Sequence, residues 1–75
     1  MSNGFHRIFD NVKIDFDAPM PLPQLMKQVE DADKEEDPFY SEYALNLLDR
    51  ARDLKNAGAI TEDQYHIINA RYPFH

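Results

Sequence analysis

The segment from Asn56 to Gln64, with the sequence N-A-G-A-I-T-E-D-Q, constrains the fold of this chain more than any other stretch. Gly58 has no Cβ, so it can adopt the left-handed backbone conformation that commonly ends a helix. Thr61 and Gln64 have the spacing of a capping box, in which each side chain bonds the backbone amide of the other residue. The segment therefore predicts a tight turn between two helices, the second of which runs from about Glu62 to Tyr72.

Apolar residues on both sides of this turn support a helical hairpin over residues 38–73. Ile60 before the cap and Tyr65 after it have the spacing of a hydrophobic staple, which fixes the angle at which the chain enters a helix. The first helix is expected to begin with Asp37 as its N-cap and Pro38 as its first residue. Its apolar face comprises Tyr40, Tyr43, Ala44, Leu47, Ala51 and Leu54.

Residues 1–17 carry two patterns that predict different structures. Apolar residues stand at every second position, as in a half-buried strand: Val12, Ile14 and Phe16. Asp10 and Asn11 can form the two-residue turn of a β-hairpin. Apolar residues also stand three or four positions apart, as on one face of a helix: Phe5, Ile8, Phe9 and Val12. We expect the hairpin, with a short helix as the alternative, because the alternation is the more regular pattern.

Residues 18–37 are expected to connect the N-terminal element to the helical hairpin. The prolines of Pro19–Pro23 favour extended backbone, and Pro23 suits the first position of a helix. A short helix that ends near Glu30 is predicted by an apolar stripe of four residues: Leu22, Leu25, Met26 and Val29. An acidic link follows this helix. Residues 1–75 are thus expected to form one small domain of the α+β class, with an all-α fold as the alternative.

The negative charge of the chain is concentrated in one segment. The formal net charge is −6, and residues 30–37 alone contribute −5 of it, from six acids and Lys34. Such a segment repels the phosphate backbone of nucleic acids. Glu62 and Asp63 would repel it as well if the last helix were the recognition helix of a helix-turn-helix. We therefore expect no direct binding to nucleic acid, and a protein partner with a basic surface.

The sequence contains no arrangement typical of an active site. It has no cysteine, which excludes disulfides and thiolate metal sites, and no stretch apolar enough to span a bilayer. We expect a protein of the cytoplasm. Four acids have the spacing of the ligands in a calcium-binding loop: Asp31, Asp33, Glu35 and Glu42. The loop also requires a glycine, and Glu36 stands at that position. We therefore expect no enzymatic activity, no cofactor and no metal site.

The helical hairpin resembles two families over residues 44–72. The pattern Leu54-x-x-x-Gly58-x-Ile60-Thr61-x-x-x-Tyr65-x-x-Ile68 is similar to the SHOCT family, short C-terminal bacterial modules with a Gly-x-Ile-Thr turn between two helices. The segment Gly-x-Ile-Thr-x-x-Gln-Tyr-x-x-Ile is also similar to small phage tail-associated proteins of the XkdX type. SHOCT members usually carry several basic residues late in the second helix, where this chain has only Arg71. The resemblance implies an interaction or oligomerisation module in a bacterial or phage setting, without catalytic residues.

We therefore expect a non-enzymatic protein-binding or regulatory module, such as an inhibitor encoded by a phage or mobile element. Its interaction residues are expected in the acidic run and in the aromatic pair that follows: Glu35, Glu36, Asp37, Phe39 and Tyr40. The alternative is a homo-oligomeric assembly protein, for example a homodimer. It would bury the apolar residues of the last helix between two copies: Tyr65, Ile68 and Tyr72.

Overall fold

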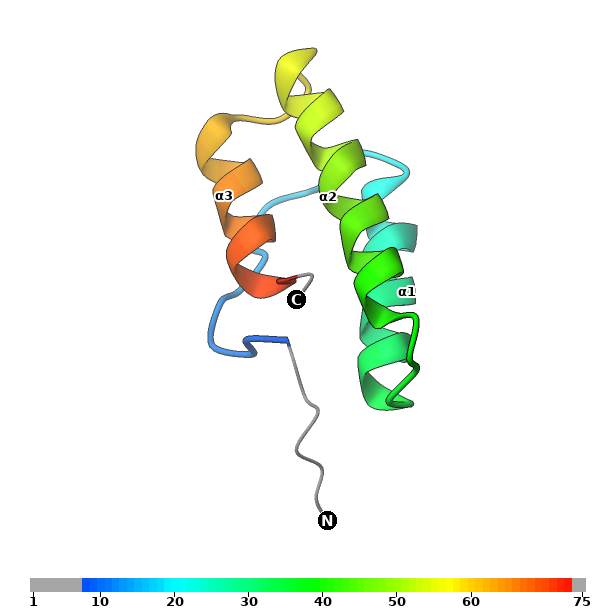
Figure 1. The fold of residues 1–75 in the computed structure, drawn as a ribbon. Coiled ribbons are helices and arrows are strands. Elements are labelled where there is room, and N and C mark those ends of the chain that lie inside the picture. Colours follow the sequence, from blue (N-terminus) through cyan, green and yellow to red (C-terminus); the bar gives the residue numbers. More distant parts are fainter. Residues whose placement is uncertain (1–7, 74–75) are drawn as a thin grey trace.

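The computed structural model describes residues 8–73, which fold into three helices. Helix α1 spans Leu22–Lys34, α2 spans Tyr40–Asn56 and α3 spans Glu62–Arg71. Within this part of the chain, α1 and α3 both pack on α2, and the backbones of α1 and α3 do not approach each other closely. The N-terminal stretch crosses from the end of α3 to the start of α1, passing behind α2 (Figure 1). The fold is therefore a helical trio in which α2 is central.

The expected α+β class is wrong, because residues 8–73 contain no strand. The all-α alternative describes the fold. Asp10 and Asn11 do form a turn, in which the Val12 N–H donates to the Phe9 carbonyl at 3.0 Å. The two sides of the turn do not pair beyond this bond, since the Phe9 N–H donates to the carbonyl of Arg71 at 3.1 Å. The alternative of a short helix is also wrong for residues 8–17, and the remainder of both expected elements lies outside the described residues.

The alternation that predicted the strand is nevertheless present in the structure. Val12, Ile14 and Phe16 are partly buried, whereas the intervening residues are exposed: Lys13, Asp15 and Asp17. Ile14 and Phe16 pack against the core that the helices form. Alternation reports an extended backbone with one buried face, and it does not report what covers that face. Here the partner is a set of helices and not a second strand.

Helices α1 and α2 end in the same Schellman motif, in which two backbone amides fold back onto the last turn. At the end of α2, the Gly58 N–H donates to Lys55 at 3.0 Å and the Ala59 N–H donates to Leu54 at 2.8 Å. Gly58 has a φ of 82°, so the predicted left-handed stop is confirmed.

At the end of α1, the residue in the left-handed position is Glu36, with a φ of 55°. The Glu36 N–H donates to the carbonyl of Asp33 at 3.2 Å, and the Asp37 N–H donates to that of Ala32 at 2.8 Å. Helix α1 therefore continues to Lys34, one turn beyond the end near Glu30 that the apolar stripe predicted. Much of the expected acidic link is helical.

The starts of the helices depend on local side-chain bonds. Thr61 and Gln64 form the predicted capping box of α3, with N–H···O distances of 3.0 and 3.1 Å. Helix α2 begins at Tyr40, two residues later than expected. Asp37 therefore caps the turn before the helix, where its Oδ1 accepts the N–H of Phe39 at 2.8 Å. Pro23 occupies the second position of α1 rather than the first.

One apolar core joins the helices and the segments between them. It includes residues from α1, α2 and α3 together with single residues from the N-terminal stretch and the α2–α3 turn: Ile8, Leu22, Met26, Val29, Ala32, Tyr40, Ala44, Leu47, Leu48, Ala51, Ile60, Ile68 and Tyr72. In the part of the chain that the structure describes, no helix is long and apolar enough to cross a membrane.

Candidate functional site

The turn between α1 and α2 carries a shallow hollow of about 210 Å³. We call residues 35–39 the acidic turn. It supplies two of the lining residues, α1 supplies three and α2 supplies one: Glu35 and Asp37, then Gln28, Asp31 and Ala32, then Tyr43. Among these described lining residues there are three acids and no base. The hollow is therefore a place where negative charge meets an aromatic ring.

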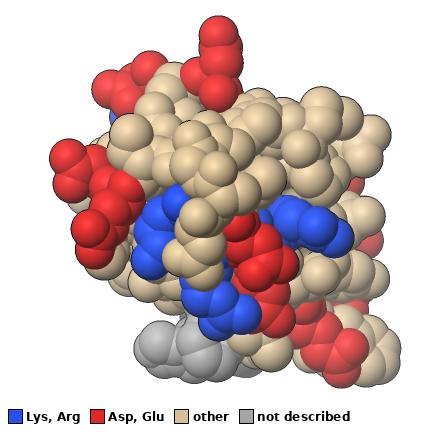
Figure 2. All heavy atoms as spheres, turned by 90° about the horizontal axis from the view of Figure 1, so that it is seen from above, with Lys and Arg blue, Asp and Glu red and all other residues tan. Residues whose placement is uncertain are grey.

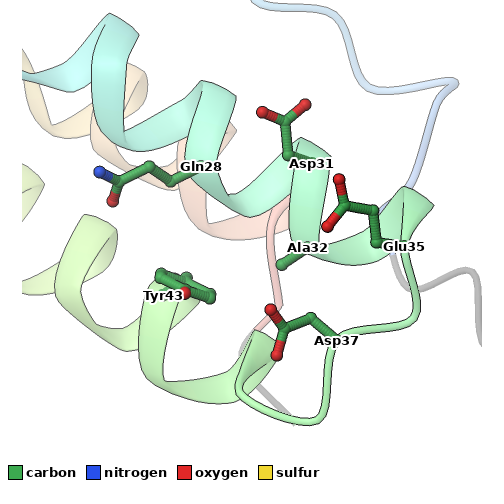
Figure 3. Close-up of a pocket in the computed structure, with 6 residues that line it drawn as sticks. All are labelled: Gln28, Asp31, Ala32, Glu35, Asp37 and Tyr43. Atoms are coloured by element: carbon green, nitrogen blue, oxygen red, sulfur yellow. The ribbon is translucent and has the colours of Figure 1, made fainter.

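The close-up in Figure 3 separates the three acids by direction. The Asp37 carboxylate points toward Tyr43 of α2, whereas the Glu35 carboxylate points back along α1, with the small Ala32 between the helices. Asp31 points away from Asp37. Its carboxylate lies 3.6 Å from the Lys27 amine, an exposed pair of the kind that stabilises a helix by only about 0.3–0.5 kcal/mol. Asp37 is therefore the acid that faces Tyr43, and Glu35 adds a second carboxylate of the acidic turn to the lining.

The opposite end of the molecule has a different charge pattern. Figure 2 views that end from above and shows Lys and Arg side chains lying among Asp and Glu side chains. Ion pairs there include Arg52 with Asp49 at 3.2 Å and His66 with Glu62 at 3.7 Å. The acidic turn differs from this end, because residues 35–39 contain three acids and no base: Glu35, Glu36 and Asp37.

The structure separates the two aromatic residues that were expected to act as a pair. Phe39 is 57% exposed, a large fraction for a phenylalanine, and it comes two residues after Asp37 of the hollow. Tyr40 is only 1% exposed and belongs to the core at the start of α2. Phe39 can therefore contact a partner, whereas Tyr40 holds the helix that positions Phe39.

The residues expected at a dimer interface lie largely inside the monomer. Ile68 and Tyr72 are fully buried in the core, and Tyr65 is partly buried against it. The Tyr65 ring also lies 4.9 Å from the Lys55 amine. The folded chain thus already covers the apolar face of α3.

A polar cluster joins the end of α3 to α1. The Tyr72 hydroxyl donates to the Glu30 carboxylate at 2.5 Å and accepts from Arg71 Nε at 3.1 Å. Burial, followed by the bond to Glu30, raises the pKa of Tyr72 to about 12. The guanidinium of Arg71 also donates to the backbone carbonyls of Val12 at 2.8 Å and Phe9 at 3.3 Å. The cluster therefore fixes the N-terminal stretch to the helices.

The acids with the spacing of a calcium-binding loop lie partly on helix α1. Within residues 8–73, no group of three or more His, Cys, Asp or Glu side chains is arranged to hold a metal ion. Asp31 and Asp33, two of the acids with calcium-loop spacing, lie in the helical part of α1. Helical backbone spreads such residues around an axis and does not let their oxygens converge on one ion.

Sequence reasoning missed Tyr43, Gln28 and Asp31 as parts of the hollow. On α1 and the residue that follows it, four of the lining residues have the spacing i, i+3, i+4 and i+7, which places them on one face of a helix: Gln28, Asp31, Ala32 and Glu35. This signal is visible only if α1 is expected to continue through the acids. Because the predicted helix ended near Glu30, the face was divided and the hollow did not appear.

In comparisons with known proteins, no family, no curated protein and no solved structure matches this chain.

Proposed function

We propose that this chain is a non-enzymatic protein-binding module that uses the acidic turn to bind a basic surface on a partner protein. The observation that carries the proposal is the hollow that Glu35, Asp37 and the ring of Tyr43 line together, with Asp37 pointing toward Tyr43. A partner lysine or arginine fits this chemistry, because its cation can pair with the carboxylates while its alkyl part lies against the ring.

Phe39 adds the apolar contact that such an interface needs. Exposed charges mainly steer association and set specificity, whereas buried aromatic anchors supply most of the affinity. Phe39 is exposed in the isolated chain and comes two residues after Asp37 of the hollow, so a partner could bury it together with its own basic side chain. The proposal therefore assigns the association rate to the acids and the residence time to Phe39.

The setting is part of the same proposal and rests on the resemblance of residues 44–72 to bacterial and phage modules. A regulatory protein of the cytoplasm, such as an inhibitor of a nucleic-acid enzyme, would meet basic protein surfaces there. The acidic turn would then compete with the phosphate backbone for those surfaces, since both present closely spaced negative charges.

The proposal is tested by capturing the partner with the wild-type chain and measuring its binding to a charge-neutralised variant. The triple variant Glu35→Gln, Glu36→Gln and Asp37→Asn keeps the side-chain shapes. The amide that replaces the Asp37 carboxylate still has an oxygen to accept the Phe39 N–H. At low salt we expect the association rate to fall by roughly tenfold or more, and its dependence on salt to flatten.

A matched control removes the same number of negative charges elsewhere. Asp49→Asn, Asp53→Asn and Glu62→Gln alter exposed residues of α2 and α3, away from the acidic turn. This control should leave the association rate close to that of the wild type. Equal losses in both triple variants would show that only net charge matters, and unchanged binding of the first would remove the acidic turn from the mechanism.

Phe39→Ala tests the other half of the proposal. Truncating an aromatic anchor at the centre of an interface typically costs about 2 kcal/mol or more, mainly through faster dissociation. Leu45→Ala is the matched control, because Leu45 is also an exposed apolar residue of this region of the fold, at 46%. A loss of affinity in both variants, or in neither, would contradict the role given to Phe39.

A further inference from the structure

Residues 8–18, which we call the strap, run from beside the end of α3 and pass behind α2 toward the start of α1 (Figure 1). Ile8 is buried in the core, and three further strap residues pack against it: Ile14, Phe16 and Ala18. The charged residues between them are exposed. The strap therefore covers an apolar surface in the way that a bound extended peptide would.

Polar bonds from the strap meet at one residue of α3. Three hydrogen bonds join the strap to Arg71. The Phe9 N–H donates to the backbone carbonyl of Arg71, and the Arg71 guanidinium donates to the carbonyls of Phe9 and Val12. Tyr72 and Glu30 hold that guanidinium in place from the other side.

We propose that the surface under the strap is a docking site for an extended segment with an apolar residue at every second position, and that the strap of a second copy of this chain is its partner. The bonds to Arg71 join residues 59 and 62 positions apart in the sequence. These bonds form whenever a strap lies against Arg71, whichever copy of the chain the strap belongs to, so the strap of a second copy can form them as well. Exchange of identical elements in this way produces a closed two-fold dimer.

The segment that follows the strap is suited to act as the hinge of this exchange. Pro19 accepts the N–H of Leu22 at 2.9 Å in the turn that leads into α1, and Met20 is 62% exposed. Opening this turn would direct the strap away from its own helices without disturbing α1. The strap would then reach another copy while both cores stay folded.

Arg71 is expected to control the rate of exchange more than its extent. The same bonds form in the closed monomer and in the exchanged dimer, so weakening them affects both states alike. They must break before the strap can leave, however, so they contribute to the barrier. Arg71→Lys keeps the charge but loses the planar guanidinium, whose Nη1 donates to both carbonyls while its Nε donates to the Tyr72 hydroxyl. This variant should exchange straps faster at a nearly unchanged proportion of dimer.

The direct test uses the full chain with a strap that cannot dock, Ile14→Asp with Phe16→Asp, and a fluorescent peptide of residues 8–18. Circular dichroism first establishes that the three helices persist. We expect the peptide to bind this variant at least tenfold more tightly than it binds the wild type, whose site is occupied. A peptide with the same two substitutions is the control and should not bind.

Three results would overturn the proposal. A helical variant that does not bind the peptide would remove the docking site. An unrelated peptide with the same alternation that binds equally well would remove the second copy as its specific partner. A wild-type chain that remains monomeric in light scattering as its concentration is raised, and does not exchange label between copies, would exclude strap exchange.

Hydrogen exchange of the wild-type chain keeps the proposal testable if the double variant unfolds. The amides of Phe9 and Val12 should exchange through a local opening, while amides in α2 exchange only by global unfolding. Arg71→Lys should accelerate hydrogen exchange at these two amides by roughly tenfold. The exchange rates of the α2 amides should change only as far as the global stability of the variant changes. Exchange of the strap amides only by global unfolding, in both chains, would contradict a releasable strap.

Discussion

Replacing Glu36 with glycine is expected to stabilise the fold, although it removes a side chain. Glu36 is held in the left-handed conformation by the Schellman motif at the end of α1, with a φ of 55°. A residue with a Cβ pays about 1–2 kcal/mol to adopt this conformation. Glycine avoids that cost but loses about 0.4–1 kcal/mol through the larger entropy of its unfolded chain. The difference predicts a gain of about 0.5–1 kcal/mol in the free energy of unfolding.

The assay is urea and thermal unfolding followed by circular dichroism. For a chain of 75 residues the predicted gain corresponds to a rise of roughly 3–6 °C in the midpoint temperature. Glu36→Gln is the control for charge, because it removes the negative charge and keeps the Cβ. This control should change stability by only a few tenths of a kcal/mol. If Glu36→Gln stabilises the chain as much as Glu36→Gly does, repulsion among the acids and not backbone conformation explains the effect.

Gly58 provides the opposite test at the matching position of α2. Its φ is 82°, and a Cβ added there would meet no atom within 4 Å. The cost of Gly58→Ala therefore reports the backbone conformation without steric overlap, and we expect a loss of about 0.5–1 kcal/mol. The double variant Glu36→Gly with Gly58→Ala should have nearly the stability of the wild type. A Gly58→Ala chain as stable as the wild type would refute the reasoning for both positions.

Two further predictions concern the ends of α3. Because the folded pKa of Tyr72 is raised to about 12, its neutral form stabilises the fold fully below pH 10, and this contribution is lost as the pH rises from 10 through 12. Urea unfolding should thus show the stability gap between wild type and Tyr72→Phe narrowing over this range, and a constant gap would contradict the assignment. Thr61→Ala should cost about 1 kcal/mol through loss of the N-cap, whereas Thr61→Ser should cost a few tenths; equal losses would point to the Thr61 methyl group.

The α2–α3 turn could be predicted in detail because its structure is written in neighbouring residues. Gly58, Thr61 and Gln64 each act on backbone groups within a few positions, so their types and spacing suffice. The end of α1 gives no such signal. Glu36 is a poor residue for a left-handed stop, whereas Ala32 in the last turn of α1 is buried in the core. Tertiary contact overrides local preference at this position.

The prediction for the N-terminal stretch failed for a related reason. Its alternating burial could be predicted, but the choice of partner depends on Arg71, which lies about sixty positions away. In the sequence Arg71 is an ordinary base near a helix end. In the structure its guanidinium replaces the backbone partners that a second strand would have offered to Phe9 and Val12. The alternation of apolar and polar residues therefore predicted the extended backbone of the strap, but it did not predict that helices rather than a second strand cover its apolar side.

The strain at Glu36 also bears on the proposed interface. A sequence specifies its fold best when local preference and tertiary structure agree, and disagreements tend to concentrate at functional sites. The two Schellman motifs of this chain differ in this respect: Gly58 agrees with its conformation, and Glu36, inside the acidic turn, does not. If the acidic turn binds a partner, Glu36→Gly should raise stability and at the same time slow association, since it removes one of the steering charges. A variant that gains stability without any loss of association would show that the strained residue serves neither the fold nor the interface.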